Sequence, residues 1–213
     1  MLIAGLLMII LIPLIAASVR VVPEGTVGLV ERLGQVVPGL RQPGLVLLRP
    51  FFETLILLPK EPFQVELKLE AETWERVPLT FAVEMQCEVK DPALLDTSLP
   101  GVPRGEGRER GVRHTIQRVK RFLDQTLVSE GRAAVRKGQL LDCLGNMDDL
   151  EKRIQERLGW HGRKQGLEIV SLQMTLLEIP EDAKQRVRQA VEEGRAGEEA
   201  ELILEDVDPP ADA

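Results

Sequence analysis

The sequence predicts an α+β fold behind an N-terminal transmembrane helix, and three patterns support this prediction. Residues 1–19 contain no charged side chain. Two segments in the first half of the chain alternate apolar and polar residues, the period of a half-buried β-strand. The second half changes to helical spacing of apolar residues before one more alternating segment. We therefore expect antiparallel strands first, and then helices that pack on further strands.

Residues 1–19 are predicted to be a transmembrane anchor. As a helix they would span roughly 28 Å, close to the hydrocarbon thickness of a bilayer. A cleaved signal peptide is one alternative, because Ala16-Ala17-Ser18 resembles a cleavage site, although no basic residue precedes the apolar run. A buried core helix is another. The residues expected to contact lipid are Leu2, Ile3, Leu6, Leu7, Ile9, Ile10, Leu11, Ile12, Leu14 and Ile15.

The charges beside this segment predict its orientation. No Lys or Arg precedes it, whereas Arg20 and Arg32 follow it. The positive-inside rule then places the N-terminus outside and the domain on the cytoplasmic side of the cell membrane.

The strands begin directly after the anchor. Pro23-Glu24-Gly25 is a turn signal between two short apolar runs, which predicts strand, turn and strand. Gly39, Pro43 and Gly44 then predict repeated chain breaks. The clearest alternation covers 63–71 and 79–89, and the short connection between them favours an antiparallel hairpin.

The helical part follows a loop predicted at 99–111. A first helix begins at Val112, a second covers 131–144, and a third runs from near Asn146 to Gly159. The last strand alternates through Val170, Leu172, Met174 and Leu176. The inward residues expected on the first two helices are Val112, Ile116, Val119, Leu123, Leu127, Ala134, Val135, Leu140 and Leu141.

Several motifs resemble the band 7 (SPFH) domain of stomatins, prohibitins and flotillins. The opening pattern PEG..G.VERLG, PGL, PG and PF covers residues 23–51, and Val89-Lys90-Asp91-Pro92 matches a V.DP step. Further similarity runs through 136–158, 166–169 and 177–181. The resemblance implies a membrane-bound scaffold that self-associates, organises lipids, or modulates a membrane protease or channel, without chemistry of its own.

The expected organisation has four parts: an anchor at 1–19, a band 7 domain at 20–180, a short helix at 181–200, and an acidic tail at 201–213. The helix carries a narrow stripe of Ala183, Val187 and Val191, predicted to contact another subunit. It is shorter than the corresponding helix of the family, since Gly194 and Gly197 weaken it. From 192 to 213, nine acidic residues and one Arg suit a solvated tail.

The sequence predicts no catalytic residue, cofactor or metal site. His114 and His161 lack partners at metal-ligand spacing, and we expect surface or capping roles for both. Residues 101–107 are glycine-rich but contain Pro and follow no buried strand, so they do not form a phosphate loop. Cys87 and Cys143 are expected to be buried thiols. A net charge of −7 and 3% aromatic residues argue against nucleic-acid binding.

The predicted function is therefore a bacterial-type membrane scaffold whose partners are the lipid bilayer, further copies of the chain, and a membrane protease or channel. One alternative is an anchored monomeric module that binds a partner without higher assembly. Another is an enzyme with an unrecognised site. Residues 104–121 hold seven Lys or Arg against two Glu, which favours a solvated helix face, with contact to anionic headgroups as the alternative.

Overall fold

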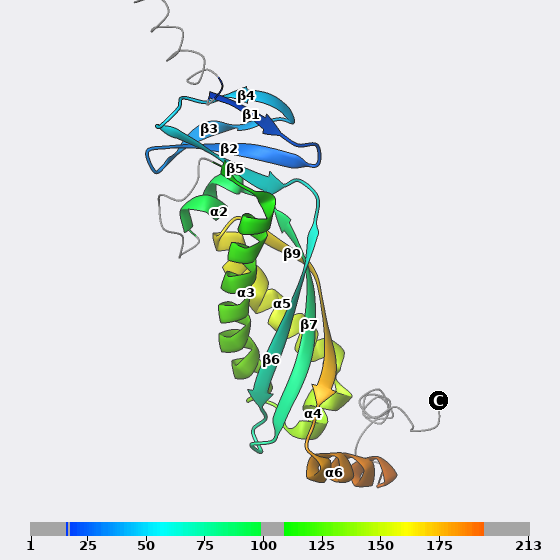
Figure 1. Cartoon of the computed structure of the whole chain (residues 1–213). Helices are drawn as coiled ribbons and strands as arrows, with labels where there is room; N and C mark the ends of the chain where they lie inside the picture. The colour runs from blue at the N-terminus through cyan, green and yellow to red at the C-terminus, as the bar shows by residue number, and fades with distance from the viewer. Residues whose placement is uncertain (1–15, 17, 99–108, 194–213) are drawn as a thin grey trace, which may run out of the picture. The chain divides into compact units, whose positions relative to one another are not determined.

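A computed structural model describes Ala16 and residues 18–98 and 109–193 of the 213-residue chain (Figure 1). It has the predicted α+β content, with antiparallel sheets and helices. The chain divides into two compact units. Unit 1 contains the residues up to Phe63 together with Glu88–Val119, and unit 2 contains Gln64–Cys87 and the residues from Lys120 onward.

Unit 1 is built from two sheets. In the first, β1 (Val19–Val22) pairs antiparallel with β4 (Gly44–Leu47). The second has the order β3 (Gln35–Arg41), β2 (Thr26–Arg32), β5 (Glu53–Pro59) and β8 (Glu109–Arg110). Its first two pairings are antiparallel, and β8 is parallel to β5.

The core of unit 1 lies on its central strands. Four consecutive residues of β5, Leu55–Leu58, are buried. A central strand covered on both faces has a continuous apolar run instead of alternation, which explains why the periodicity did not predict β5. A cluster of Val22, Val30, Leu48, Leu55 and Leu57 joins both sheets.

Two local predictions for unit 1 had different outcomes. The turn at Pro23-Glu24-Gly25 is confirmed: Gly25 has a φ of 75°, and the Thr26 N–H donates to Pro23 O at 3.3 Å. The break predicted at Gly39 does not end β3, but the pairing of β3 with β2 shifts register between Val37 and Arg41, and Gly39 has a φ of 99°. Pro38 is tolerated because β3 is an edge strand, where a missing N–H need not remove a ladder bond.

A short helix, α2 (Pro92–Ser98), was not predicted. Asp91 is its N-cap: Oδ1 accepts the N–H groups of Ala93 at 3.0 Å and Leu94 at 3.1 Å. Pro92 then occupies the first helical position, where a missing N–H costs nothing. The sequence signal for this helix is the pair Asp91-Pro92, which also forms part of the V.DP step.

Unit 2 contains a three-stranded sheet of order β6 (Phe63–Glu72), β7 (Pro78–Val89) and β9 (Leu167–Glu178). The predicted hairpin is confirmed, since β6 and β7 run in opposite directions (Figure 1) and the Thr73 N–H donates to Val77 O at 3.0 Å. Alternate side chains are buried on one face: Val65, Leu67, Leu69, Ala71, Leu79, Phe81, Val83, Met85 and Cys87.

The alternation in β9 changes phase in the middle of the strand. Leu167 and Ile169 are buried, and burial resumes at Leu172. Val170 and Ser171 are both exposed. The predicted alternation through Val170, Leu172, Met174 and Leu176 is therefore confirmed for the last three residues and fails at Val170, because the two adjacent exposed residues move the buried set from odd to even positions.

The helices of unit 2 run past glycines that were predicted to interrupt them. α3 (Val112–Val135) begins in unit 1 and passes through Gly131, and α5 (Met147–Lys164) passes through Gly159. A Cβ at Gly131 would lie 2.8 Å from Leu69 Cδ2, so this glycine permits close packing of α3 on β6. α4 (Leu140–Gly145) lies between these helices in sequence and leaves Leu141 only half-buried.

The predicted C-terminal helix is present as α6 (Glu181–Glu192). Ala183 and Val187 are fully buried, and Val191 is half-buried. The predicted segments at 1–15, 99–108 and 194–213 lie outside the described residues. The last residue assigned to the anchor, Val19, is the first residue of β1. Within the described ranges, no helix is long and apolar enough to cross a membrane.

Candidate functional site

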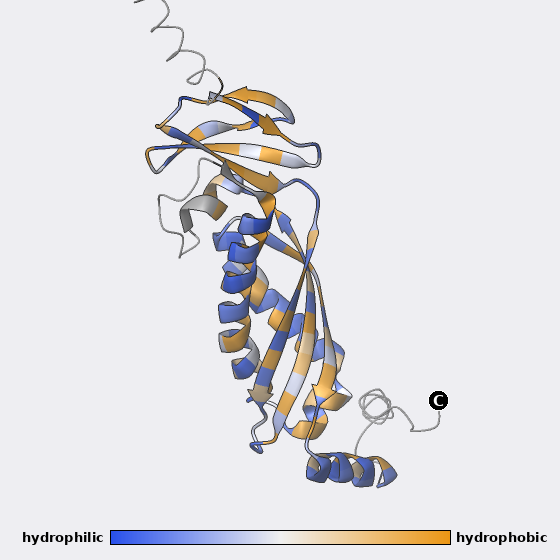
Figure 2. Cartoon of the chain, in the orientation of Figure 1, coloured by the Kyte–Doolittle hydropathy of each residue, from blue (hydrophilic) through white to orange (hydrophobic). Residues whose placement is uncertain are grey.

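The β1–β4 sheet presents an apolar face to solvent. Val19 pairs with Leu47 and Val21 pairs with Leu45, so these four side chains share one face of the ribbon. Their exposed fractions are 38%, 75%, 57% and 79% in that order. The opposite face includes Val22, which is buried in the core. Figure 2 shows the hydrophobic positions of both strands in orange.

This apolar face lies where the charge-free N-terminal segment meets unit 1. Ser18 O accepts the N–H of Leu48 at 2.8 Å. The end of β4 is therefore fixed beside the residue that directly follows the apolar sequence of residues 1–17. Only a few residues of chain separate that sequence from the exposed side chains of the ribbon.

Two turns of unit 1 expose further large apolar residues. Leu33 lies between β2 and β3 and is 76% exposed, while Phe51 and Phe52 precede β5 and are 73% and 56% exposed. The Leu33 N–H donates to Phe52 O at 3.1 Å, which joins the two turns. We call Leu33, Phe51 and Phe52 the apolar tip.

A buried carboxylate organises the apolar tip. The Glu53 side chain is only 7% exposed, and its Oε1 accepts Arg32 Nε at 2.9 Å and Arg32 Nη2 at 2.6 Å. Its Oε2 accepts the backbone N–H of Arg49 at 2.8 Å. Since Arg32 adjoins Leu33 and Arg49 opens the second turn, Glu53 holds both turns in one arrangement.

These contacts also change the acidity of Glu53. The hydrogen bond from the Arg49 backbone lowers the pKa of this carboxyl below its ordinary value of 4.5, and burial opposes that effect. The hydrogen bonds and positive charge of Arg32 lower the pKa further. The ionised form is therefore the one that stabilises the tip.

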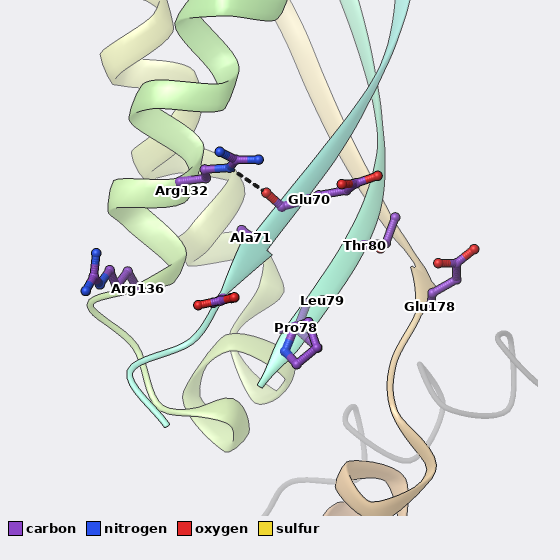
Figure 3. A pocket seen from close by; sticks show the side chains of 9 residues that line it. Glu70, Ala71, Pro78, Leu79, Thr80, Arg132, Arg136 and Glu178 are labelled. Carbon is purple, nitrogen blue, oxygen red and sulfur yellow. Dashed lines mark hydrogen bonds between the residues drawn. The ribbon is translucent and has the colours of Figure 1, made fainter. Parts of the chain in front are cut away.

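Unit 2 contains an open groove of about 620 Å³. Its lining includes Arg132 of α3, Arg136 directly after α3, and Glu70 and Glu178 of the sheet (Figure 3). Arg132 Nε donates to the backbone oxygen of Glu70 at 2.8 Å. Among the described residues, the lining includes the carboxylates of Glu70, Glu72 and Glu178 and the hydroxyl of Thr80, but no His, Cys or Ser.

The two histidines have separate surroundings. His114 lies in the first turn of α3. His161 lies in the last turn of α5. Its Nε2 is 3.4 Å from Glu130 Oε1, while the other oxygen of Glu130 accepts Arg157 Nη1 at 3.0 Å. No group of three potential metal ligands occurs within the described part of the chain.

The two cysteines are buried, as predicted. Cys87 is fully buried and Cys143 is 4% exposed. Loss of solvation raises the pKa of Cys87 to about 12 and that of Cys143 to about 11. Both are therefore thiols at neutral pH, and neither has the lowered pKa of a nucleophile.

The fold and its surfaces define an α+β domain with an apolar face beside an apolar N-terminal segment. Comparison with protein families shows a match to the SPFH domain / Band 7 family over residues 20–205. The chain belongs to this family, as its sequence motifs predicted. Members of the family are generally membrane-associated scaffolds that oligomerise and are not enzymes. No curated protein matches the chain.

The apolar tip and Glu53 were not predicted as a site. Leu33, Phe51 and Phe52 were noticed only within the family motif, although large apolar residues beside Gly34 and Pro50 are unusual for exposed turns. Arg32 and Glu53 are 21 residues apart, so a local sequence pattern could not predict their contact. Their contact appears only once β2 and β5 are paired, which brings Arg32 opposite Glu53.

Proposed function

We propose that this protein is a membrane-anchored Band 7 scaffold that self-associates and organises the membrane or modulates a membrane protease or channel. The observation that carries the proposal is the exposed face of β1 and β4 beside Ser18. An apolar face at that position is suited to the boundary between lipid and water, because it continues the charge-free sequence of residues 1–17.

The proposed anchor lies within the predicted segment 1–19 and ends before Val19, which belongs to β1, with the domain on the cytoplasmic side. Arg20 and Arg32 follow the segment and support this orientation. Anchoring in a plane raises the effective concentration of neighbouring copies, so weak contacts between them can accumulate. Assembly would then depend on the membrane as well as on the strength of each protein contact.

Subunit contact through α6 remains a prediction with a narrower basis. Ala183 and Val187 have no exposed surface in the described chain, whereas Val191 keeps part of its surface. This observation favours the alternative of an anchored monomeric binding module over a contact that uses all three residues. The two functions differ in one measurable property, the number of copies in the membrane.

Anchoring is tested by placing two arginines in the proposed span, Leu7→Arg with Leu11→Arg. Each central arginine costs about 2.5–3.5 kcal/mol on insertion scales, so the variant should leave the membrane fraction after alkaline extraction. The control is Gln64→Arg with Gln185→Arg, which adds the same charge at exposed positions. Retention of the first variant at the level of the control would refute the anchor.

A further inference from the structure

The apolar tip has an unfavourable backbone conformation. Arg32 and Gln35 are paired, so Leu33 and Gly34 form a two-residue turn, with φ angles of 51° and 84°. A turn with two positive φ angles favours Asn-Gly. Leu33 therefore occupies a position at which a large apolar residue is strained.

The second turn repeats this feature. Phe51 follows Pro50 and has a φ of 72°, and the N–H of Phe52 donates to Arg49 O at 3.3 Å. A turn with Pro at its second position and positive φ at its third normally carries Gly at the third. Two large apolar side chains thus stand in adjoining turns where Asn or Gly fits best.

Burial within the chain does not compensate for this strain. Leu33 and Phe51 are each more than 70% exposed, so neither gains much from removal of apolar surface from water. The buried ion pair of Glu53 and the bond between Leu33 and Phe52 nevertheless hold the turns together. Their arrangement suggests a favourable environment outside the isolated chain.

We propose that the apolar tip inserts into the lipid boundary as a second membrane contact, positioned by Glu53. The inference rests on the proposed function, because it requires unit 1 to be anchored. Phe51 is three residues beyond Leu48, whose N–H is bonded to Ser18 O. At no more than about 3.6 Å per residue, the second turn lies within about 11 Å of Leu48, beside the point where the apolar N-terminal sequence ends.

The charges around the tip fit the same environment. Arg49 precedes Phe51 and is exposed, so its charge can meet anionic headgroups while the apolar side chains enter the lipid. Arg32 is paired with Glu53 and holds the first turn in place. Phe and Leu are the residues that an interfacial membrane contact uses. An apolar pocket of a partner protein would need no continuity with the N-terminal segment, and it is distinguished by the experiment below.

The test uses the full chain with Trp74 and Trp160 replaced by Phe and a single new tryptophan at position 51, Phe51→Trp. The protein is placed in vesicles whose acyl chains carry bromine, which quenches nearby indoles. We expect at least twofold quenching of this tryptophan. The matched control is Glu61→Trp in the same background, an exposed position of unit 1, and little quenching is expected there.

Equal quenching at positions 51 and 61 would overturn the proposal, even if the protein floats with the vesicles and the anchor is thereby supported. Blue-shifted emission from position 51 without bromine quenching would indicate a protein partner and would also overturn it. Failure to float with the vesicles would refute the proposed anchor and the tip contact together.

A second test separates lipid insertion from folding. Leu33→Asn with Phe51→Gly introduces residues that suit the positive φ angles, and Phe52→Trp reports on lipid in the same tryptophan-free background. We expect at least a twofold loss of quenching together with an equal or higher denaturation midpoint for unit 1. Unchanged quenching would contradict a role for Leu33 and Phe51 in insertion.

Discussion

Glu53→Ala should release the two turns of the apolar tip while unit 1 stays folded. The substitution removes the acceptor of the Arg49 N–H, a hydrogen bond to a charged and buried group that contributes about 1.5–3 kcal/mol. The pair with Arg32 adds less than about 1 kcal/mol, since the Arg32 side chain is 43% exposed. The expected total is about 2–3 kcal/mol.

Hydrogen exchange measures this effect at the site. A loss of about 2 kcal/mol in local stability corresponds to roughly 30-fold faster exchange, expected in the peptide that contains the amides of Arg49 and Glu53. Glu61→Ala removes an exposed carboxylate from the same unit and is the control. Equal exchange in the two variants would refute the role assigned to Glu53.

The same site predicts a pH dependence. The folded state lowers the pKa of Glu53, so its contribution is complete above the ordinary value of 4.5 and is lost as the pH falls through the folded pKa. The stability difference between the native chain and Glu53→Gln should therefore be largest near pH 7 and shrink below pH 4.5. A difference that grows on acidification would show that ionised Glu53 does not stabilise the fold.

Three further predictions concern packing, thiol chemistry and capping. Gly131→Ala should destabilise unit 2 by about 1 kcal/mol, since overpacking against Leu69 costs more than the gain in helix propensity. Denaturant unfolding followed by tryptophan fluorescence measures this loss. The control is Gly145→Ala, whose new Cβ would have no neighbouring atom within 4 Å and which should not destabilise the unit. Cys87 and Cys143 should react with a thiol reagent at pH 8 only after denaturation, because both are buried and their pKa values are raised to about 12 and 11. Asp91→Ala should cost α2 about 1 kcal/mol, seen as roughly fivefold faster amide exchange at Ala93 and Leu94.

The apolar and polar alternation of the sequence predicted the strands that have one buried face and one solvent-exposed face. β6 and β7 alternate from Val65 to Cys87 because helices cover only one face of their sheet. β5 was not predicted, because Leu55–Leu58 are all buried and show no alternation. Periodicity therefore reports the asymmetry of burial and fails for a strand that is covered on both sides.

Helix ends were predicted poorly wherever glycine was treated only as a weak helix former. Gly131, where a second helix was predicted to begin, lies inside α3, and Gly162 lies inside α5 beyond the predicted stop at Gly159. Another element approaches both Gly131 and Gly162 closely. A Cβ at Gly162 would be 3.2 Å from Leu167 O, at the start of β9. Such tertiary packing outweighs a propensity cost of about 1 kcal/mol, and it cannot be recognised before the neighbour is known.

Local sequence patterns could not predict the candidate site, because its residues come together only through strand pairing. The motif that identified the family contains Arg32, Leu33 and Phe51, but it does not state that their turns adjoin. That information comes from the pairing of β2 with β5 and from the backbone bond between Leu33 and Phe52. The sequence contains these residues, but it does not show that they lie next to one another in the fold.

The most direct test of the proposed scaffold is the mass of the full-length protein extracted in native nanodiscs, which retain the surrounding lipid. A membrane-anchored Band 7 scaffold should yield particles with many copies of the 23.8 kDa chain. Particles that contain one copy, at the expression level of the cell, would contradict self-association and support the monomeric binding module.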